Sequence, residues 1–237
     1  MDQTEQKMLA ARYAIDSLIE SGSIFSGMKI GLGTGSTAMV AVKRLAECIA
    51  DGGLAGIRAV STSFQTTLAC EDYGIPVYSL NSKEISGELD LTIDGADEIS
   101  PEKFLVKGGG AALLLEKIAA YNSGSYVIIA DESKIVHSLG TSFPLPVEIV
   151  PEARTSVIRA LMATGASVVL REAVKKAGPV VTDNGNFIID CKWKEPVNPA
   201  EFENFINSIV GVVENGFFTK KIPAVYMADR EGSVKKY

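Results

Sequence analysis

The alternation of short apolar runs with helix-like segments over the first 135 residues most constrains the fold of this chain. Apolar runs of strand length occupy residues 28–32, 57–60, 77–80, 89–93, 104–106 and 126–130. Segments with apolar residues at helical spacing separate several of them, at residues 4–21, 36–49, 64–73 and 110–121. This alternation predicts a Rossmann-like open α/β sheet with helices on both faces.

After residue 143 the order of the expected elements changes. The pattern there predicts strands at 147–150, 167–170, 187–190 and 210–214, with helices at 151–164 and 199–208. This β-α-β-β-α-β order is typical of a ferredoxin-like unit, and Asn184-Gly185 supplies left-handed turn conformations between two of its strands. The apolar segment 224–227 is expected to return to the first sheet. The sequence thus predicts a Rossmann-like domain at 1–143 and 216–237, and a smaller ferredoxin-like α+β domain at 144–215.

Composition narrows the class of protein. The chain of 237 residues has a net charge of −6 and no long basic run, which argues against a nucleic-acid partner. Three widely spaced cysteines without a C-x-x-C pair indicate free thiols in a reducing compartment, so a cytoplasmic protein is expected. Residues 1–22 carry acids and bases within their apolar pattern, so they predict neither a signal peptide nor a membrane span.

The single histidine limits the chemistry. His137 lies in SKIVHSLG, a stretch that looks helical, and a structural or surface role is expected for it. A histidine-based metal site or a catalytic triad would have to depend on this one imidazole. Acid–base work is therefore expected from carboxylates and lysines.

The glycine-rich segment GLGTGSTA at residues 31–38 joins an expected strand to an expected helix. Its glycines allow a sharp turn, and the free N–H groups at the helix start favour a phosphate; Thr34, Ser36 and Thr37 add hydroxyl groups. A nucleotide P-loop would need Lys where Ser36 stands, and a dinucleotide fingerprint would need an acid about 20 residues later. A single phosphate fits better, and a purely structural turn is the alternative.

The segment DLTIDGADE at residues 90–98 places four carboxylates in nine residues. Ionised carboxylates so close together repel one another, and burying them costs free energy unless a cation or a proton intervenes. These acids therefore need partners from elsewhere in the chain or from a ligand.

A second candidate segment is FLVKGGGAALLLEK at residues 104–117. Lys107 ends an expected strand, and the three glycines after it expose backbone donors before a helix. On that helix Glu116 has apolar neighbours one turn away in both directions and no basic neighbour at helical spacing, which is typical of an acid poised to take a proton. The alternative is a surface glutamate beside Lys117.

The segment ADESK at residues 130–134 places Lys134 directly after another strand. Thr34, Asp94 and Lys107 also follow strands. Because ligands of open α/β sheets gather beyond the carboxyl ends of the strands, these residues are expected to converge at that edge.

Six segments in this order and spacing resemble a known family: GLGTGSTA, DGADE, KGGGAALLLEK, ADESK, FPLPVE and VVTDNGN. Nearly the whole chain resembles ribose-5-phosphate isomerase of the type A family. The resemblance implies interconversion of ribose 5-phosphate and ribulose 5-phosphate in the non-oxidative pentose phosphate pathway, with no metal and no organic cofactor. It also implies a homodimer or a homotetramer.

The family pattern also assigns site residues. By this resemblance the substrate contacts are Thr34, Gly35, Ser36, Thr37, Asp94, Gly95, Ala96, Asp97, Lys107, Gly108, Gly109, Gly110 and Lys134. The catalytic base falls on Glu116, and residues 61–65 are a less specific contact region. One departure is Leu115, where the family commonly has Arg next to the base.

The expected reaction gives these residues roles. Moving the carbonyl between C1 and C2 requires a proton to leave one carbon and return to the other through an enediolate, and Glu116 is expected to carry it. Asp94 and Asp97 are expected to hold hydroxyl groups and shuttle protons, with Lys107 keeping both aspartates ionised and stabilising the oxyanion. A Mg²⁺ site is the rival, since magnesium also favours clustered carboxylates.

Three other classes of protein remain as alternatives. A sugar-phosphate-binding sensor domain without turnover would need a DNA-binding segment, and residues 1–27 offer one helix and no basic face. An NAD-dependent enzyme lacks the expected ribose-binding acid, and an acyl-CoA transferase would want a longer chain. Glu116 and Lys107 together favour an enzyme.

Overall fold

The computed structural model describes all of residues 1–237, and the chain forms two compact units. Unit 1 comprises Met1–Gly95, Ile118–Ser133 and Pro223–Tyr237, and unit 2 comprises Ala96–Lys117 and Lys134–Ile222. Residues 96–117, 134–143 and 216–222 thus belong to the second unit, whereas the sequence-based boundaries place them in the Rossmann-like domain. The sequence-based domain boundaries stay a prediction.

Unit 1 is built on a six-stranded sheet. Its strands are β1 (Lys29–Leu32), β2 (Arg58–Ser61), β3 (Leu89–Asp94), β6 (Ser123–Asp131), β12 (Ala224–Ala228) and β13 (Val234–Lys236). Their order is β13-β12-β6-β3-β1-β2, and all neighbours run parallel except the β12–β13 pair. The predicted open sheet is confirmed, and so is the return of the tail into it.

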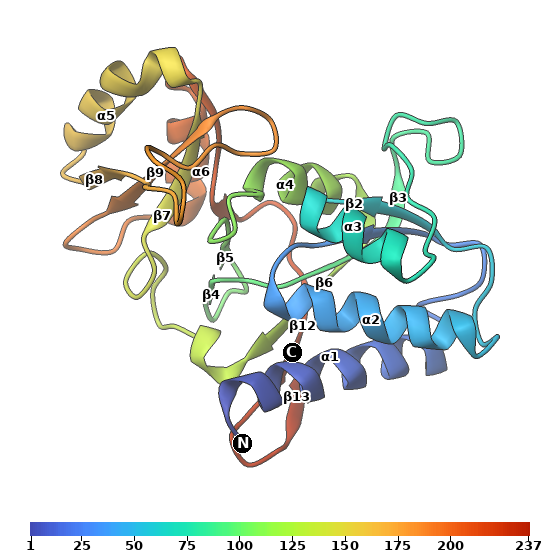
Figure 1. The fold of residues 1–237 in the computed structure, drawn as a ribbon. Coiled ribbons are helices and arrows are strands. Elements are labelled where there is room, and N and C mark those ends of the chain that lie inside the picture. Colours follow the sequence, from blue (N-terminus) through green and yellow to red (C-terminus); the bar gives the residue numbers. More distant parts are fainter. The chain divides into compact units, whose positions relative to one another are not determined.

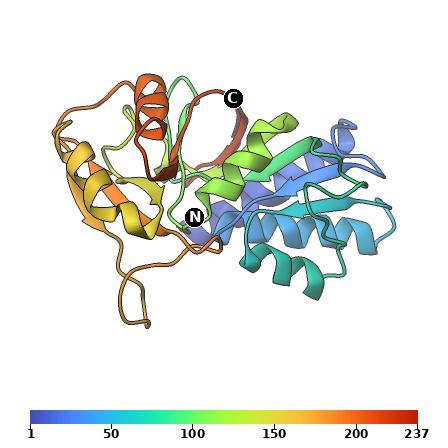
Figure 2. The same cartoon turned by 90° about the horizontal axis from the view of Figure 1, so that it is seen from above.

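Helices cover both faces of this sheet. They are α1 (Gln3–Glu20), α2 (Ser36–Ala50), α3 (Phe64–Asp72) and α4 (Leu113–Tyr121), whose last residues belong to unit 1. Helices α1 and α2 pack together on one face, and α4 lies on the opposite face from α2 (Figures 1 and 2). None of the helices combines the length and the apolar character needed to cross a membrane.

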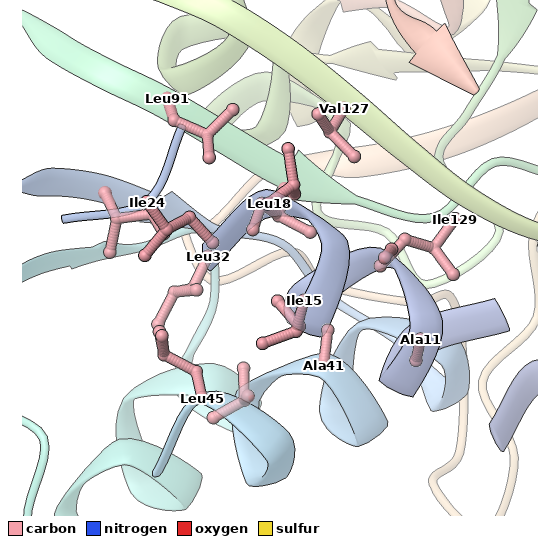
Figure 3. Packing of buried hydrophobic residues seen from close by; sticks show 14 of the residues in the cluster. Ala11, Ile15, Leu18, Ile24, Leu32, Ala41, Leu45, Leu91, Val127 and Ile129 are labelled. Carbon is pink, nitrogen blue, oxygen red and sulfur yellow. The ribbon is translucent and has the colours of Figure 1, made fainter. Parts of the chain in front are cut away.

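The core of unit 1 lies between the sheet and the α1–α2 layer. Ile15 and Leu18 of α1 and Leu45 of α2 are buried against sheet residues such as Leu32 and Val127 (Figure 3). Every third or fourth residue of each helix faces this layer. This packing explains why apolar residues occur at helical spacing in the sequence.

Unit 2 contains a four-stranded antiparallel sheet with two helices. Its elements are β7 (Leu145–Ile149), the short η2 (Pro151–Ala153), α5 (Arg154–Met162), β8 (Ser167–Leu170), β9 (Phe187–Lys192), α6 (Pro199–Asn207) and β10 (Val212–Asn215). The strand order is β10-β7-β9-β8, so the first and third strands are central. This confirms the predicted ferredoxin-like arrangement.

A separate three-stranded sheet in unit 2 is a feature that the sequence analysis did not foresee. It consists of β4 (Glu98–Ile99), β5 (Leu105–Val106) and β11 (Phe217–Phe218), in the order β11-β5-β4. The apolar run 104–106 is a strand as predicted, but it belongs here and not to the large sheet. Strands of two residues leave almost no periodic signal, which is why the pattern did not reveal this sheet.

Three local predictions of secondary structure are wrong. Residues 77–80 form one isolated bridge, from Val77 to Ala59, because the chain enters a turn at Ser79. The helix expected from residue 110 begins at Leu113, since Ala111 has a φ of 58° that a helix does not accept. In the 183–186 turn only Gly185, and not Asn184, has a positive φ.

The SKIVHSLG stretch is also not an α-helix. A short helical turn, η1 (Glu132–Lys134), ends at Lys134, and Ile135 then pairs with Ile99 of β4. Further along, the amides of Gly140 and later residues donate to a buried carboxylate, described below.

Candidate active site

The glycine-rich turn lies between β1 and α2 in unit 1. Gly33 leaves no room for a side chain, since a Cβ atom there would lie 1.9 Å from Oδ1 of Asp94. Gly35 has a φ of 97° and precedes α2, whose N-terminus has no side-chain cap. The first N–H groups of α2 are therefore not bonded to a capping side chain, which together with the helix dipole favours an anion.

Lys7 adds a positive charge at this helix start. Its Nζ atom donates to Oγ of Ser36 at 3.3 Å. Sequence reasoning missed Lys7 because its position on α1 shows only helical spacing and no motif. Nothing local to residues 4–21 indicates that this lysine reaches residue 36.

A group of hydroxyl side chains supports the turn. Oγ1 of Thr34 donates to Oγ of Ser63 at 2.7 Å and lies 2.8 Å from Oγ1 of Thr62. The amide of Gly35 donates to Oε1 of Gln65 at 3.0 Å. The structure thus brings residues 61–65 to the turn.

Asp94 ends β3 and is fully buried. Its Oδ1 atom accepts the N–H groups of Thr34 at 3.2 Å and Gly95 at 2.7 Å. Gly95 faces Thr37, since a Cβ atom on the glycine would lie 3.6 Å from Cβ of Thr37. Unit 1 therefore brings together Thr34, Gly35, Ser36, Thr37, Asp94 and Gly95.

Asp97 belongs to unit 2, three residues further along the chain. Its Oδ2 atom accepts the N–H of Gly109 at 2.8 Å, and its own amide donates to the carbonyl of Val106. Glycine at position 109 allows this close approach, because an added Cβ atom would lie 2.6 Å from Oδ1 of Asp97. The Gly108 to Gly110 loop thus presents one backbone donor, the N–H of Gly109, to this carboxylate, which follows Ala96 in the chain.

Glu98, the last acid of DLTIDGADE, is buried and holds a loop. Its carboxylate accepts the N–H groups of Gly140 at 2.5 Å, Ser142 at 2.7 Å and Phe143 at 2.6 Å. The crowded acids are therefore accommodated largely by backbone N–H groups. Such backbone donors cannot be read from residue types, so the sequence analysis did not predict them.

Lys107 and Glu116 form a buried ion pair. Nζ of Lys107 lies 3.2 Å from Oε2 of Glu116, and the two side chains are 3% and 5% exposed. Glu116 is thus not the surface glutamate of the alternative reading. Lys107 thus contacts Glu116, and this acid lies beside a cation able to stabilise developing negative charge.

Arg171, the residue after β8, supports the glycine loop. Its Nη1 atom donates to the carbonyl oxygens of Gly108 at 2.9 Å and Gly109 at 3.1 Å, while its guanidinium also pairs with Asp190. Sequence reasoning missed this residue, since it follows a strand of the ferredoxin-like fold and no motif marks it.

The predicted site residues fall into two sets. The set in unit 2 comprises Ala96, Asp97, Lys107, Gly108, Gly109, Gly110, Glu116 and Lys134. Lys134 lies at the end of η1, half-buried, beside the Ile135–Ile99 bridge. The peptide bond between Gly95 and Ala96 joins the two sets. The structure groups no three His, Cys, Asp or Glu side chains in an arrangement that could hold a metal ion.

Comparison with known proteins gives a consistent result. The family model described as ribose 5-phosphate isomerase A (phosphoriboisomerase A) matches residues 58–232. Ribose-5-phosphate isomerase A of Treponema denticola is 60% identical over 237 residues, with 99% of each chain covered. The protein of the same name from Treponema pallidum is 56% identical over 238 residues, with 100% of this chain and 94% of that protein covered.

A solved structure agrees with these relatives. The structure of a D-ribose-5-phosphate isomerase in complex with phospho-erythronic acid is 40% identical and has a TM-score of 0.92, covering 100% of this chain and 99% of that chain. Both the sequence and the fold therefore match over the whole length. The chain belongs to the ribose-5-phosphate isomerase A family.

Proposed function

We propose that this chain, an aldose–ketose isomerase that interconverts ribose 5-phosphate and ribulose 5-phosphate, moves the proton with Glu116. The observation that carries the proposal is the buried ion pair between Lys107 and Glu116, at 3.2 Å. A carboxylate held beside a cation and away from water combines a base with a group that stabilises an oxyanion.

The steps follow from these groups. Glu116 takes the proton from C2 of the open-chain aldose, and the electron pair moves to the carbonyl oxygen on C1, which gives an enediolate. Lys107 stabilises the negative charge on oxygen. A proton then passes from the C2 hydroxyl to the C1 oxygen, assisted by Asp94 and Asp97, and Glu116 returns its proton to C1.

The phosphate is proposed to bind at the start of α2. The uncapped N–H groups there, the hydroxyls of Ser36 and Thr37, and the Lys7 ammonium supply donors and positive charge. Lys134 is proposed as a further cation for the same group, on the family pattern. Phospho-erythronic acid, found bound to the related isomerase, has the phosphate and carboxylate groups that such a site would bind.

The proposal extends to cofactor, location and assembly. Every proposed step uses side chains of this chain, so the reaction requires neither a metal nor an organic cofactor. The three cysteines are free thiols, two of them buried, which suits the reducing cytoplasm. A homodimer or homotetramer is proposed from the family resemblance.

The test is an assay with chelator-treated protein. We expect purified enzyme, stripped of metal, to convert ribose 5-phosphate to a ketose at an undiminished rate. Loss of activity that added Mg²⁺ restores would replace the proposal with a metal-dependent mechanism. Tight binding of phospho-erythronic acid without any turnover would instead favour the sensor domain.

A further inference from the structure

A second lysine lies directly beside the proposed base, is buried, and has no part in the proposed chemistry. Lys117 follows Glu116 on α4 and is 4% exposed. Its Nζ atom lies 2.8 Å from Oε1 of Glu214 and 3.4 Å from Oε1 of Glu203, and donates to the carbonyl of Asn215 at 2.7 Å. A buried charge needs such partners. An apolar residue at this position would avoid the free energy cost of removing the lysine charge from water.

The two carboxylates are themselves held in place. Glu203 on α6 is 1% exposed and accepts the N–H of Thr219 at 3.0 Å and its hydroxyl at 2.5 Å. Glu214 on β10 accepts the side-chain amide of Asn207 at 2.6 Å and the backbone amide of Asn215 at 2.8 Å. Lys117 thus ties the first turns of α4 to α6 and β10 through a fixed polar network.

One aromatic ring links this network to the Lys107–Glu116 pair. Nζ of Lys117 lies 4.8 Å from the ring centroid of Phe218, and Nζ of Lys107 lies 5.7 Å from the same centroid. Phe218 is fully buried. Both ammonium groups therefore contact the same ring, in surroundings where charges act on one another with little screening from water.

We propose that Lys117 is a positioning residue for Glu116. Held by Glu203 and Glu214, it fixes the first turns of α4 so that Glu116 meets Lys107, and its positive charge keeps Glu116 able to accept a proton at lower pH. The inference rests on the proposed role of Glu116 as the base.

Burial and the nearby carboxylates have opposite effects on the pKa of Lys117. Burial lowers the pKa of Lys117, and the carboxylates of Glu214 and Glu203 oppose this effect. Glu148 on β7, the register partner of Glu214, is a further acid on the same side. Removing the lysine charge should favour protonated Glu116, whereas removing the Glu203 charge should favour its ionised form.

The experiment compares four variants by the pH dependence of kcat/KM, by KM and by thermal unfolding. In Lys117→Met we expect kcat to fall about 10- to 100-fold with little change in KM, as for a misplaced catalytic group. The acid limb of the profile should move upward by about 0.5 to 1 pH unit. In Glu203→Gln the limb should move downward. Lys117→Arg should restore most of kcat, and Lys194→Met, on the surface, should change nothing.

The opposite shifts separate positioning from simple damage. The substrate phosphate titrates equally in every assay, so only differences between variants are read. The inference is overturned if the acid limb of the pH profile stays in place in Lys117→Met and Glu203→Gln, or moves in the same direction in both. This holds even if Glu116→Gln is inactive. An active Glu116→Gln would instead remove the proposed function. If Lys117→Met does not fold, the inference is tested by the other two variants. The acid limb of the pH profile should still move downward in Glu203→Gln, and Lys117→Arg should still retain most of kcat.

Discussion

The two units hold their candidate site residues by different means. In unit 1 the turn that carries Thr34 and the carboxylate of Asp94 are fixed by backbone N–H groups and hydroxyls, at 2.7 to 3.2 Å. In unit 2 Glu116 is fixed by a buried ion pair with Lys107, and the next residue, Lys117, forms a second buried pair with Glu203. The N–H and hydroxyl donors of unit 1 suit binding, because they do not titrate, whereas a buried ion pair adjusts the strength of an acid.

This difference teaches where reactivity resides. Removing charges from water is expensive, and a buried ion pair contributes little net stability compared with apolar residues of the same size. The two adjacent lysine–glutamate pairs of unit 2 are therefore better explained by chemistry than by folding. Unit 1 is expected to govern affinity, and unit 2 to govern the rate of proton transfer.

The largest expected effect comes from removing the base. Glu116→Gln keeps the shape of the side chain but cannot accept a proton, so kcat should fall by about 10²- to 10⁴-fold. Steady-state kinetics measure this loss, and Glu152→Gln, at an exposed glutamate, serves as the control. A loss of less than about tenfold would place the base elsewhere.

Removing the partner cation should have two effects. In Lys107→Met we expect kcat/KM to fall by about 10²- to 10³-fold, as for loss of an oxyanion donor. The variant also leaves Glu116 buried without its cation, which should lower the free energy of unfolding by about 3–5 kcal/mol at neutral pH. The difference in free energy of unfolding between the unsubstituted protein and Lys107→Met should narrow as the pH falls and Glu116 becomes neutral.

Urea unfolding at several pH values, with exposed Lys192→Met as control, measures the second effect of Lys107→Met. If the difference in free energy of unfolding does not depend on pH, the lysine acts by packing alone.

A change in unit 1 should affect binding more than rate. In Gly33→Ala the new Cβ atom would lie 1.9 Å from Oδ1 of Asp94, so the turn or the carboxylate must move. We expect affinity for phospho-erythronic acid to fall about tenfold and the free energy of unfolding to fall by about 1–3 kcal/mol. Calorimetric titration measures the affinity.

Gly53→Ala is the matched control for Gly33→Ala, since its nearest atom beyond its chain neighbours is the Cys48 carbonyl oxygen at 3.3 Å. A variant at Gly33 with normal affinity but a greatly reduced kcat would reverse the proposed division of labour between the units.

The smallest effect concerns a carboxylate of unit 2 with no lysine partner among its hydrogen bonds. Glu148 accepts from Thr182 and Asn186, and burial raises the pKa of its carboxyl group. The folded protein thus binds more protons than the unfolded chain, so this group lowers stability as pH rises from the usual pKa of glutamate toward the raised value.

Glu148→Gln removes that titration and keeps an acceptor oxygen. Relative to the natural protein, the variant should therefore be more stable at about pH 8 than it is at about pH 5. Denaturant unfolding at both pH values measures the change. Parallel stability curves for the two proteins would show that Glu148 does not titrate in this range.

Much of the fold was predictable because its signals are local. The spacing of apolar residues in α1 and α2 records the layer that these helices pack against, and the element order after residue 143 led to the strand order β10-β7-β9-β8. Predictions failed where backbone conformation competes with pattern. Ala111 delays α4, and a turn at Ser79 ends an apolar run before a strand forms.

The site was predictable where glycines and acids cluster in the sequence. The turn around Gly33 and the position of Glu116 on an apolar helix face both carry local signals. No local signal marks the contacts of Lys7 and Arg171 or the pairing of Lys107 with Glu116. Each of these contacts joins residues that only the tertiary fold brings together. The buried role of Lys117 carried no local signal, because its carboxylate partners lie about ninety residues away along the chain.

Transfer of hydrogen by Glu116 is tested most directly by turnover in deuterium oxide. During many cycles of isomerisation, the carbon-bound hydrogen carried by the carboxyl group should exchange with solvent, so the products should gain deuterium at C1 of the ketose and C2 of the aldose. Products without solvent deuterium at either carbon would indicate direct hydride migration and contradict the account.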